Sequence, residues 1–265
     1  LSSFMGALAT FYAQVDLVHI EAGLRTHCMQ SPWPEELHRT LIAQMAKHHF
    51  APTALARQAL IKEGISAESI HISVNTAIDA VRLATQGTVI PIKGKYVVIT
   101  MHRRENFGDE QKIVCKALQV LAKTHPQVRF RFYLHHNPNA QAPIVKALSH
   151  IDNIELLSPL VHKDFVRIMA GALFIITDSG GIQEEAAYLG KPVIVIRHKT
   201  ERMEGVAVGG AILPAFRWET LVTISDQLLS APQRLQERSV PHAAFGNGFA
   251  AENILQVLID HYAHA

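Results

Sequence analysis

The sequence predicts an α/β protein. Short apolar runs of four or five residues alternate along the chain with longer segments whose apolar residues recur at helical spacing. Some runs, such as residues 192–196, are almost continuously apolar, which is typical of strands buried on both faces. Polar and glycine-containing clusters follow several of these runs directly, at the point where open α/β sheets bind ligands.

The first part of the chain predicts one domain, which we place at residues 1–90. Leu1–Gln14 is apolar and contains alanines, like the middle of an α/β unit. Pro34 at a helix start and the helical spacing of the apolar residues after it predict the next helix. The elements expected here are strands at residues 17–20 and 70–73 and helices at residues 34–48, 54–63 and 76–85.

A second domain is predicted over residues 91–265, after a stretch rich in Pro, Gly and Lys at residues 87–95. Helices are expected between its strands, and residues 252–261 predict a closing helix. The expected strands are residues 96–100, 130–134, 154–157, 173–177 and 192–196, with a short one at residues 211–213.

Composition narrows the class of protein. The 265 residues fit one large or two modest domains, and a net charge of +2 with 48% hydrophobic residues gives no sign of a nucleic-acid partner. No run of about 18 apolar residues predicts a membrane span, and no basic segment precedes an apolar start. Cys28 and Cys115 are far apart, so neither a disulfide framework nor a thiolate metal site is indicated, and a reducing cytoplasm is expected.

The segment Asp178–Gly181 predicts an anion site. It follows a strand and precedes a helix, and its serine and glycines let backbone N–H groups approach an anion at the positive end of the helix dipole. Glu184 and Glu185 would repel a phosphate unless one of them is directed to sugar hydroxyls. The alternative is a serine that merely caps the helix.

Cations follow two further strands. The segment Arg197–Arg202 comes after residues 192–196, and His102, Arg103 and Arg104 come after residues 96–101. Arginines suit bidentate phosphate binding, and a histidine beside a pyrophosphate can stabilise departing charge. Since the ends of successive strands meet at one edge of the sheet, a binding site is favoured over a set of surface cations.

Acidic residues mark the first domain. Glu21 directly follows the strand at residues 17–20 and needs a partner or a ligand, whereas Glu35 and Glu36 at a helix start are also explained by first-turn capping. The adjacent His135 and His136 would point apart in a strand, which argues against joint metal binding. With no glycine fingerprint for a dinucleotide, we expect neither a metal nor a cofactor.

Six motifs resemble the non-hydrolysing UDP-N-acetylglucosamine 2-epimerases. They occur in the family's order and cover nearly the whole chain, which makes them far more specific together than singly. The motifs are HIEAGLRT at residues 19–26, SPWPEELHRT at 31–40, VITMHRRENFG at 98–108, DSGGIQEE at 178–185, GKPVIVIR at 190–197 and TERME at 200–204.

This resemblance implies two Rossmann-like domains of glycosyltransferase-B type. It also implies a homodimeric enzyme that interconverts UDP-GlcNAc and UDP-ManNAc by eliminating and re-adding UDP, supplying ManNAc units for cell-surface polysaccharide. Glu21 and Glu35 match carboxylates implicated in proton transfer, and His102 matches a histidine implicated at the pyrophosphate. The expected substrate-binding residues are Arg103, Arg104, Phe165, Ser179, Gly180, Gly181, Glu185 and Arg202.

The sequence also departs from the family pattern. Segments of the type GTRPE and HGDT, the second carrying another catalytic carboxylate, have no counterpart, so we expect a truncated first domain and little or no epimerase activity. Val74 stands where the family has glycine, which matters if the position needs a positive φ. The alternatives are a hydrolysing epimerase that releases free ManNAc, an inactive nucleotide-sugar-binding protein, or a glycosyltransferase of the same fold.

Overall fold

The computed structural model describes residues 1–30, 32–86, 94–103, 108–198 and 200–263. The chain forms two compact units: unit 1 comprises residues 1–80 and 245–265, and unit 2 comprises residues 81–244. The domain boundary expected at residue 90 falls within residues 87–93, outside the described ranges. The segment from Phe245 onward, which the sequence analysis counted with the second domain, groups with unit 1.

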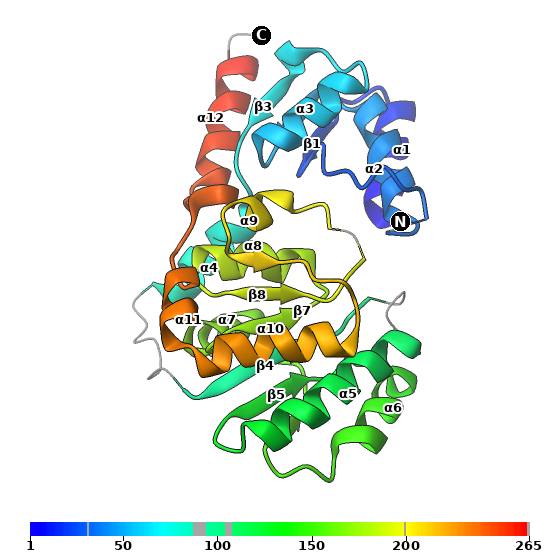
Figure 1. The fold of residues 1–265 in the computed structure, drawn as a ribbon. Helices are drawn as coiled ribbons and strands as arrows, with labels where there is room; N and C mark the ends of the chain where they lie inside the picture. The colour runs from blue at the N-terminus through cyan, green and yellow to red at the C-terminus, as the bar shows by residue number, and fades with distance from the viewer. Residues whose placement is uncertain (31, 87–93, 104–107, 199, 264–265) are drawn as a thin grey trace. The chain divides into compact units, whose positions relative to one another are not determined.

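Unit 2 contains a six-stranded parallel sheet (Figure 1). Its strands are β4 (Tyr96–Thr100), β5 (Arg129–Tyr133), β6 (Ile154–Leu157), β7 (Ile175–Thr177), β8 (Val193–Val195) and β9 (Ala211–Ile212). They lie in the order β6-β5-β4-β7-β8-β9, which is the strand order of a Rossmann fold, 3-2-1-4-5-6. The order reverses between β4 and β7, so a ligand crevice is expected at that point.

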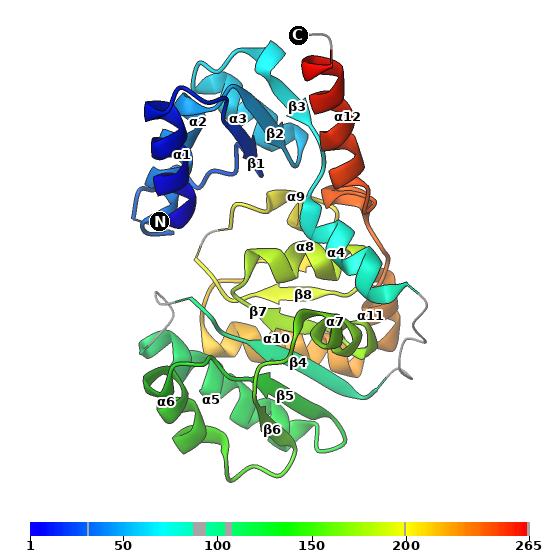
Figure 2. The same ribbon diagram turned by 180° about the vertical axis from the view of Figure 1, so that it is seen from behind.

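Helices cover both faces of this sheet (Figures 1 and 2). One face packs against α5 (Asp109–Thr124), α6 (Pro138–Leu148) and α10 (Trp218–Ser230), with α11 (Pro232–Arg238) beside them. The other packs against α7 (His162–Gly171) and α8 (Gly180–Tyr188), with the short α9 (Met203–Ala207) next to α8. Both faces are therefore buried, as the apolar strands predicted.

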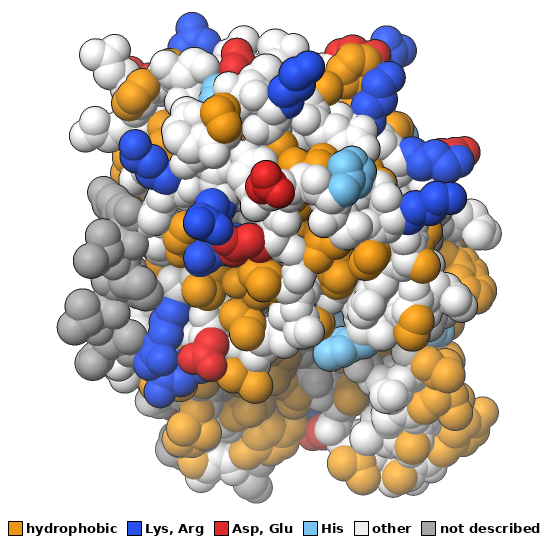
Figure 3. All heavy atoms as spheres, turned by 90° about the horizontal axis from the view of Figure 1, so that it is seen from below, with side chains coloured by type: hydrophobic (Ala, Val, Ile, Leu, Met, Phe, Trp, Pro, Cys, Tyr) orange, Lys and Arg blue, Asp and Glu red, His pale blue; other side chains and the backbone are white. Residues whose placement is uncertain are grey.

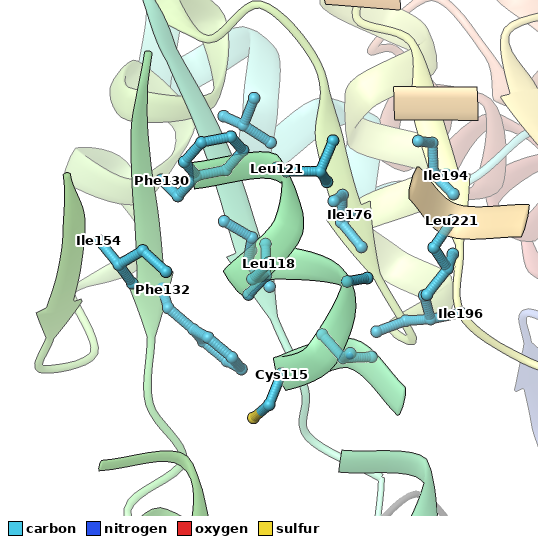
Figure 4. Close-up of a cluster of buried hydrophobic side chains, with 14 of the residues drawn as sticks. Cys115, Leu118, Leu121, Phe130, Phe132, Ile154, Ile176, Ile194, Ile196 and Leu221 are labelled. Carbon is cyan, nitrogen blue, oxygen red and sulfur yellow. The ribbon is translucent and has the colours of Figure 1, made fainter. Parts of the chain in front are cut away.

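The larger core of unit 2 lies between its sheet and α5. Figure 4 shows Leu118 and Leu121 of α5 beside Phe130 and Phe132 of β5 and Ile176 of β7. These side chains are almost completely buried, and burial of each contributes about 1.5–3 kcal/mol. This packing holds β4, β5 and β7 in fixed register, and their carboxyl ends carry the predicted site.

Unit 1 has a three-stranded parallel sheet in the order β1-β2-β3. Its strands are β1 (Val18–Ile20), β2 (His48–Ala51) and β3 (Ile70–Ile72), and its helices are α1 (Ser2–Tyr12), α2 (Glu35–Met45), α3 (Ala54–Lys62) and α12 (Ala250–Tyr262). Short 3₁₀ turns, η1 (Ala67–Ser69) and η3 (Ala243–Phe245), precede β3 and α12. The α/β class predicted from the sequence is confirmed in both units.

Strand β2 was missed by the sequence analysis, which extended the preceding helix through His48. Helix α2 ends at Met45, because Ala46 adopts an extended backbone conformation. All four residues of β2 are buried, and the strand lies between β1 and β3. The strand begins with two polar residues, His48 and His49, so its sequence lacks the apolar run that predicts a buried strand. Their burial is tolerated in part because the His49 Nε2 atom lies 2.8 Å from the Ala43 carbonyl oxygen, to which it donates.

The N-terminus of helix α12 is capped by a carboxylate from another helix. It has no side-chain cap of its own at Phe249, and its first two N–H groups, those of Ala250 and Ala251, donate to the Asp79 carboxylate over 3.0 and 2.9 Å. Asp79 lies in α4 (Thr76–Thr85) and is buried. A buried negative charge at a helix N-terminus satisfies otherwise unpaired donors and complements the helix dipole.

None of the helices in the described ranges has the length and apolar content needed to cross a bilayer. On the face shown in Figure 3, Lys and Arg side chains are interspersed with Asp and Glu among hydrophobic ones, which agrees with the small net charge of +2.

Asp79→Ala should destabilise the protein by about 1–2 kcal/mol, because it leaves two donors at the start of α12 without an acceptor. Asp79→Asn should cost less, since one oxygen remains. Asp109→Ala is the matched control, because Asp109 also lies in a first helical turn but is exposed, with Lys112 as its partner. Urea unfolding measures all three, and equal effects of Asp79→Ala and Asp109→Ala would contradict the assignment.

Candidate functional site

The site in unit 2 begins where β4, β7 and β8 end. Thr100 of β4 pairs in register with Thr177 of β7, which pairs with Val195 of β8. The Thr100 and Thr177 hydroxyl oxygens lie 2.7 Å apart and both residues are fully buried. Since the strands are parallel, the segments that follow them emerge together at the point where the strand order reverses.

The glycine turn after β7 forms the start of α8. Ser179 is the N-cap, and its hydroxyl accepts from the Ile182 N–H over 3.4 Å, so the predicted capping role is present. The N–H groups of Gly180 and Gly181 come next, and the described residues provide no acceptor for them. Two such donors at a helix N-terminus suit an anion.

Arg202 packs directly against this turn. A Cβ atom at Gly180 would lie 2.6 Å from the Arg202 Cζ atom, so any larger residue there would force the guanidinium out of its present position. The guanidinium is held by Glu184, whose Oε1 accepts from Nε over 2.8 Å, and by Glu201 through a short contact with Nη1. Glu184 is thereby engaged with an arginine.

Glu201 is the centre of a buried cluster of arginines. Besides Arg202, it contacts Arg197 Nη1 at 2.7 Å and Arg103 Nη2 at 3.5 Å. Burial alone would raise the pKa of Glu201, but the guanidiniums of Arg202, Arg197 and Arg103 outweigh burial and lower that pKa to about 2. One carboxylate from the segment after β8 thus fixes cations that follow β4 and β8.

Some hydrogen-bond donors of the buried Arg197 side chain lack an acceptor among the described residues. The residue is 2% exposed, and its Nε and Nη2 atoms have no hydrogen-bond partner in the described part of the chain. Buried guanidinium donors are costly unless they are paired. The charge of Arg197 is balanced by Glu201, but within the described ranges these two donors remain unsatisfied at the end of β8.

Asp178 joins the segment after β4 to the turn after β7. Its carboxylate accepts from the His102 N–H at 2.9 and 3.1 Å and from the Arg103 N–H at 2.9 Å. The Arg103 Nε atom also donates to the Asp178 carbonyl over 3.1 Å. Asp178 itself is completely buried.

Glu185 and Phe165 lie on neighbouring helices. The Glu185 carboxylate is 3.1 Å from His162 Nε2 of α7, and burial raises the pKa of Glu185 while the His162 contact opposes that shift. Phe165, also on α7, packs edge-on against Tyr133 with ring centroids 5.2 Å apart. Because it is partly buried, Phe165 combines a packing role with some exposed ring surface.

In unit 1, Glu21 is held by a buried asparagine. Glu21 is exposed and has a φ of 61°, and its Oε1 atom accepts a hydrogen bond from Asn75 Nδ2 over 2.9 Å. Asn75 Oδ1 in turn accepts from the Ala77 N–H, and its own N–H donates to the Phe245 carbonyl. Asn75 thereby fixes the Glu21 carboxylate to the start of α4.

Val74, next to Asn75, has φ of 62°, so the concern about a positive φ at this position is confirmed. A left-handed conformation costs a residue with a Cβ atom about 1–2 kcal/mol. A Cβ atom on Gly246 would lie 2.7 Å from that of Val74, so this strained residue is closely packed.

Glu35 and Glu36 differ in environment. Glu36 is buried and accepts from the Thr26 and His27 N–H groups over 2.9 and 2.8 Å, which holds the loop after β1. Glu35 is exposed on the first turn of α2. The exposed member of the pair is therefore the one accessible to a ligand.

The structure places most of the predicted site in unit 2. His102, Arg103, Ser179, Gly180, Gly181 and Arg202 lie at the ends of β4, β7 and β8, and Phe165 and Glu185 lie on α7 and α8 of the same unit. Glu21 and Glu35 belong to unit 1, and Arg104 lies outside the described residues. Sequence reasoning missed the organising roles of Asp178, Glu201 and Asn75. An acidic residue directly after a buried strand, as at Asp178, was the available signal. Within the described ranges, no three His, Cys, Asp or Glu side chains are arranged to hold a metal ion.

The strand order of unit 2 and the glycine turn at its switch point define the Rossmann class of α/β proteins, which place nucleotides or other anionic ligands at that edge. Comparison with known proteins specifies the class further. The chain belongs to the UDP-N-acetylglucosamine 2-epimerase family, whose model matches residues 1–259. It is thus a member of a family of isomerases, as the motifs indicated.

Characterised relatives agree with this assignment. The chain is 39% identical to the UDP-N-acetylglucosamine 2-epimerase of Campylobacter jejuni, over 96% of this chain and 71% of that protein, and 39% identical to that of Escherichia coli, over 95% and 71%. The crystal structure of the Neisseria meningitidis UDP-GlcNAc 2-epimerase bound to UDP-GlcNAc superimposes with a TM-score of 0.93 at 36% identity, covering 97% of this chain and 73% of that one. The predicted fold of Rossmann-like domains of glycosyltransferase-B type is confirmed by such neighbours.

Glu201→Gln should lower the free energy of unfolding near pH 7 by about 3–5 kcal/mol, because buried guanidiniums lose their counter-charge. Glu155→Gln is the control: Glu155 also pairs with two arginines, Arg129 and Arg131, but at partly exposed positions, so its loss should cost about 1 kcal/mol or less. Urea unfolding measures both variants, and equal losses would refute a special role for Glu201.

The stabilisation from Glu201 should also depend on pH. Because its pKa in the folded protein, about 2, lies below the ordinary 4.5, this stabilisation is complete above about pH 4.5 and is lost as the pH falls towards 2. The difference in unfolding free energy between wild type and Glu201→Gln should shrink over that window. A difference that stays constant from pH 7 to about pH 2.5 would show that the carboxylate charge is not responsible.

Proposed function

We propose that this chain interconverts UDP-GlcNAc and UDP-ManNAc by elimination and re-addition of UDP, in the cytoplasm and as a homodimer, and supplies ManNAc units for cell-surface polysaccharide. The observation that carries the proposal is the set of unsatisfied donors at the switch point of unit 2, in a chain of this family. The N–H groups of Gly180 and Gly181, at the N-terminus of α8, suit the pyrophosphate of UDP.

We assign the remaining UDP contacts to other residues of unit 2. Arg202 is fixed beside the glycine turn by Glu184 and Glu201, and we assign to it a charge-assisted contact with the phosphates. We assign the same role to Arg103 and, from the sequence alone, to Arg104. Since Glu184 is engaged with Arg202, we assign the ribose hydroxyls to Glu185 and the uracil to Phe165, with Ser179 at the phosphates.

The sugar chemistry requires acid–base groups. A carboxylate removes the proton at C2, the bond from C1 to the UDP oxygen breaks, and a C1=C2 double bond forms. UDP then adds back to C1 while an acid delivers a proton to the opposite face of C2. We assign these transfers to Glu21 and Glu35, and the leaving pyrophosphate to His102. The sequence of steps is redox-neutral, so it needs no nicotinamide cofactor.

The bond between sugar and UDP distinguishes this proposal from its alternative. In a hydrolysing epimerase water takes the place of UDP in the second step, and free ManNAc leaves. Incubation of the purified protein with UDP-GlcNAc in deuterated water, followed by NMR of the products, should give a mixture of UDP-GlcNAc and UDP-ManNAc with deuterium at C2. Free ManNAc would mean hydrolysis, and binding without deuterium exchange would mean an inactive binding protein.

Gly180→Ala should weaken UDP binding at least about fivefold, a change of about 1 kcal/mol, because its methyl group displaces the Arg202 guanidinium. Gly210→Ala is the control in the same unit, since Gly210 is outside the assigned UDP site and a Cβ atom there would make only ordinary contacts, 3.4 Å from the His242 Cδ2 atom. Titration calorimetry with UDP compares the two. Equal affinities would show that Arg202 and the turn do not form the UDP site.

A further inference from the structure

We infer that Asp178 is a positioning residue for His102. Its carboxylate accepts hydrogen bonds from the backbone N–H groups of His102 and Arg103 and thereby fixes the position of the histidine ring. This inference rests on the proposed function, in which His102 serves the leaving pyrophosphate. Asp178 itself need touch neither substrate nor reacting atom.

The geometry is specific to this role. Two consecutive N–H groups, those of His102 and Arg103, converge on one carboxylate at 2.9–3.1 Å. These residues are the second and third after the point where β4 ends, so the carboxylate fixes the direction in which the chain leaves the sheet. The Arg103 Nε atom also donates to the Asp178 carbonyl oxygen, so the two segments are joined by side-chain as well as backbone donors.

A purely structural role explains this arrangement less well. The ends of β4 and β7 are already joined by their ladder and by the hydroxyl contact between Thr100 and Thr177. A fully buried carboxylate is costly to desolvate and is retained where it accepts strong hydrogen bonds. Here those bonds go to the loop that carries His102, beyond the ladder.

Electrostatics point the same way. The pKa of His102 lies below its ordinary value: loss of surrounding water lowers it most, the negative charge of Asp178 opposes that shift, and the neighbouring His135 and His136 lower it further. The His135 ring centroid is 5.9 Å from that of His102, and Arg103 follows directly in the chain. Among these groups Asp178 is the one that favours a protonated imidazole, the form that best stabilises a departing phosphate.

The experiment compares Asp178→Asn with wild type and with Asp226→Asn. Asp226 is the matched control, because its Oδ1 atom lies 2.9 Å from Nε2 of another histidine, His125. NMR titration follows the His102 ring, identified by its absence from the spectrum of His102→Gln. In Asp178→Asn the pKa of His102 should fall by on the order of half a unit or more, and Asp226→Asn should leave it unchanged. An unaltered His102 titration in Asp178→Asn would overturn the inference.

Kinetics supply the second readout. For a positioning residue we expect kcat of Asp178→Asn to fall about 10- to 100-fold while KM for UDP-GlcNAc changes little, because the interaction acts on the leaving group. A rise in KM with unchanged kcat would assign Asp178 to substrate binding instead. If wild type shows no turnover, the proposed function fails, and the NMR titration still decides the role of Asp178.

Asp178→Glu separates charge from placement and replaces Asp178→Asn if that variant does not fold. It keeps the negative charge but moves it by one methylene group. The His102 pKa should then stay closer to that of wild type while kcat still falls. Full activity of Asp178→Glu would overturn the inference, since precise placement would be unnecessary.

Discussion

The site in unit 2 depends on buried carboxylates that are paired with donors at the ends of β4, β7 and β8. Asp178 holds the backbone after β4, and Glu201 holds arginines that follow β4 and β8. A buried charge without a partner would cost several kcal/mol. The loops therefore keep one arrangement in which anion-binding groups are already oriented before any ligand arrives, which reduces the entropic cost of binding.

In unit 1, too, buried polar side chains fix loops and helix ends, but each acts singly and not as part of a cluster. Glu36 holds the loop after β1, Asn75 holds Glu21, and Asp79 holds the start of α12. Each of these side chains is buried, and the hydrogen-bond partners that it holds there lie between 9 positions (Glu36) and 172 positions (Asp79) away in the sequence. The strained φ of Val74 persists beside Asn75, where the surrounding hydrogen bonds leave the chain no relaxed alternative.

Strands and helices were predictable wherever one periodicity dominated. Strands β4 and β6 and helix α4 match their predicted ranges, and strands β5, β7, β8 and β9 differ by one or two residues at their ends. Strand β2 was not predictable, because its two histidines look polar in sequence and are buried only by β1 and β3 on either side. Tertiary burial overrode the local pattern at that strand.

The sequence by itself determined the α/β class, the family and the residue types of the site, because these follow from periodicity and from motifs that are local in the chain. Only the tertiary structure decided which charges meet. Glu184 pairs with Arg202, His102 is tied to Asp178 across 76 positions, and Glu201 reaches Arg103 across 98. Such pairings arise from the strand order β4-β7-β8, which brings the ends of distant strands side by side, and no local pattern records that order.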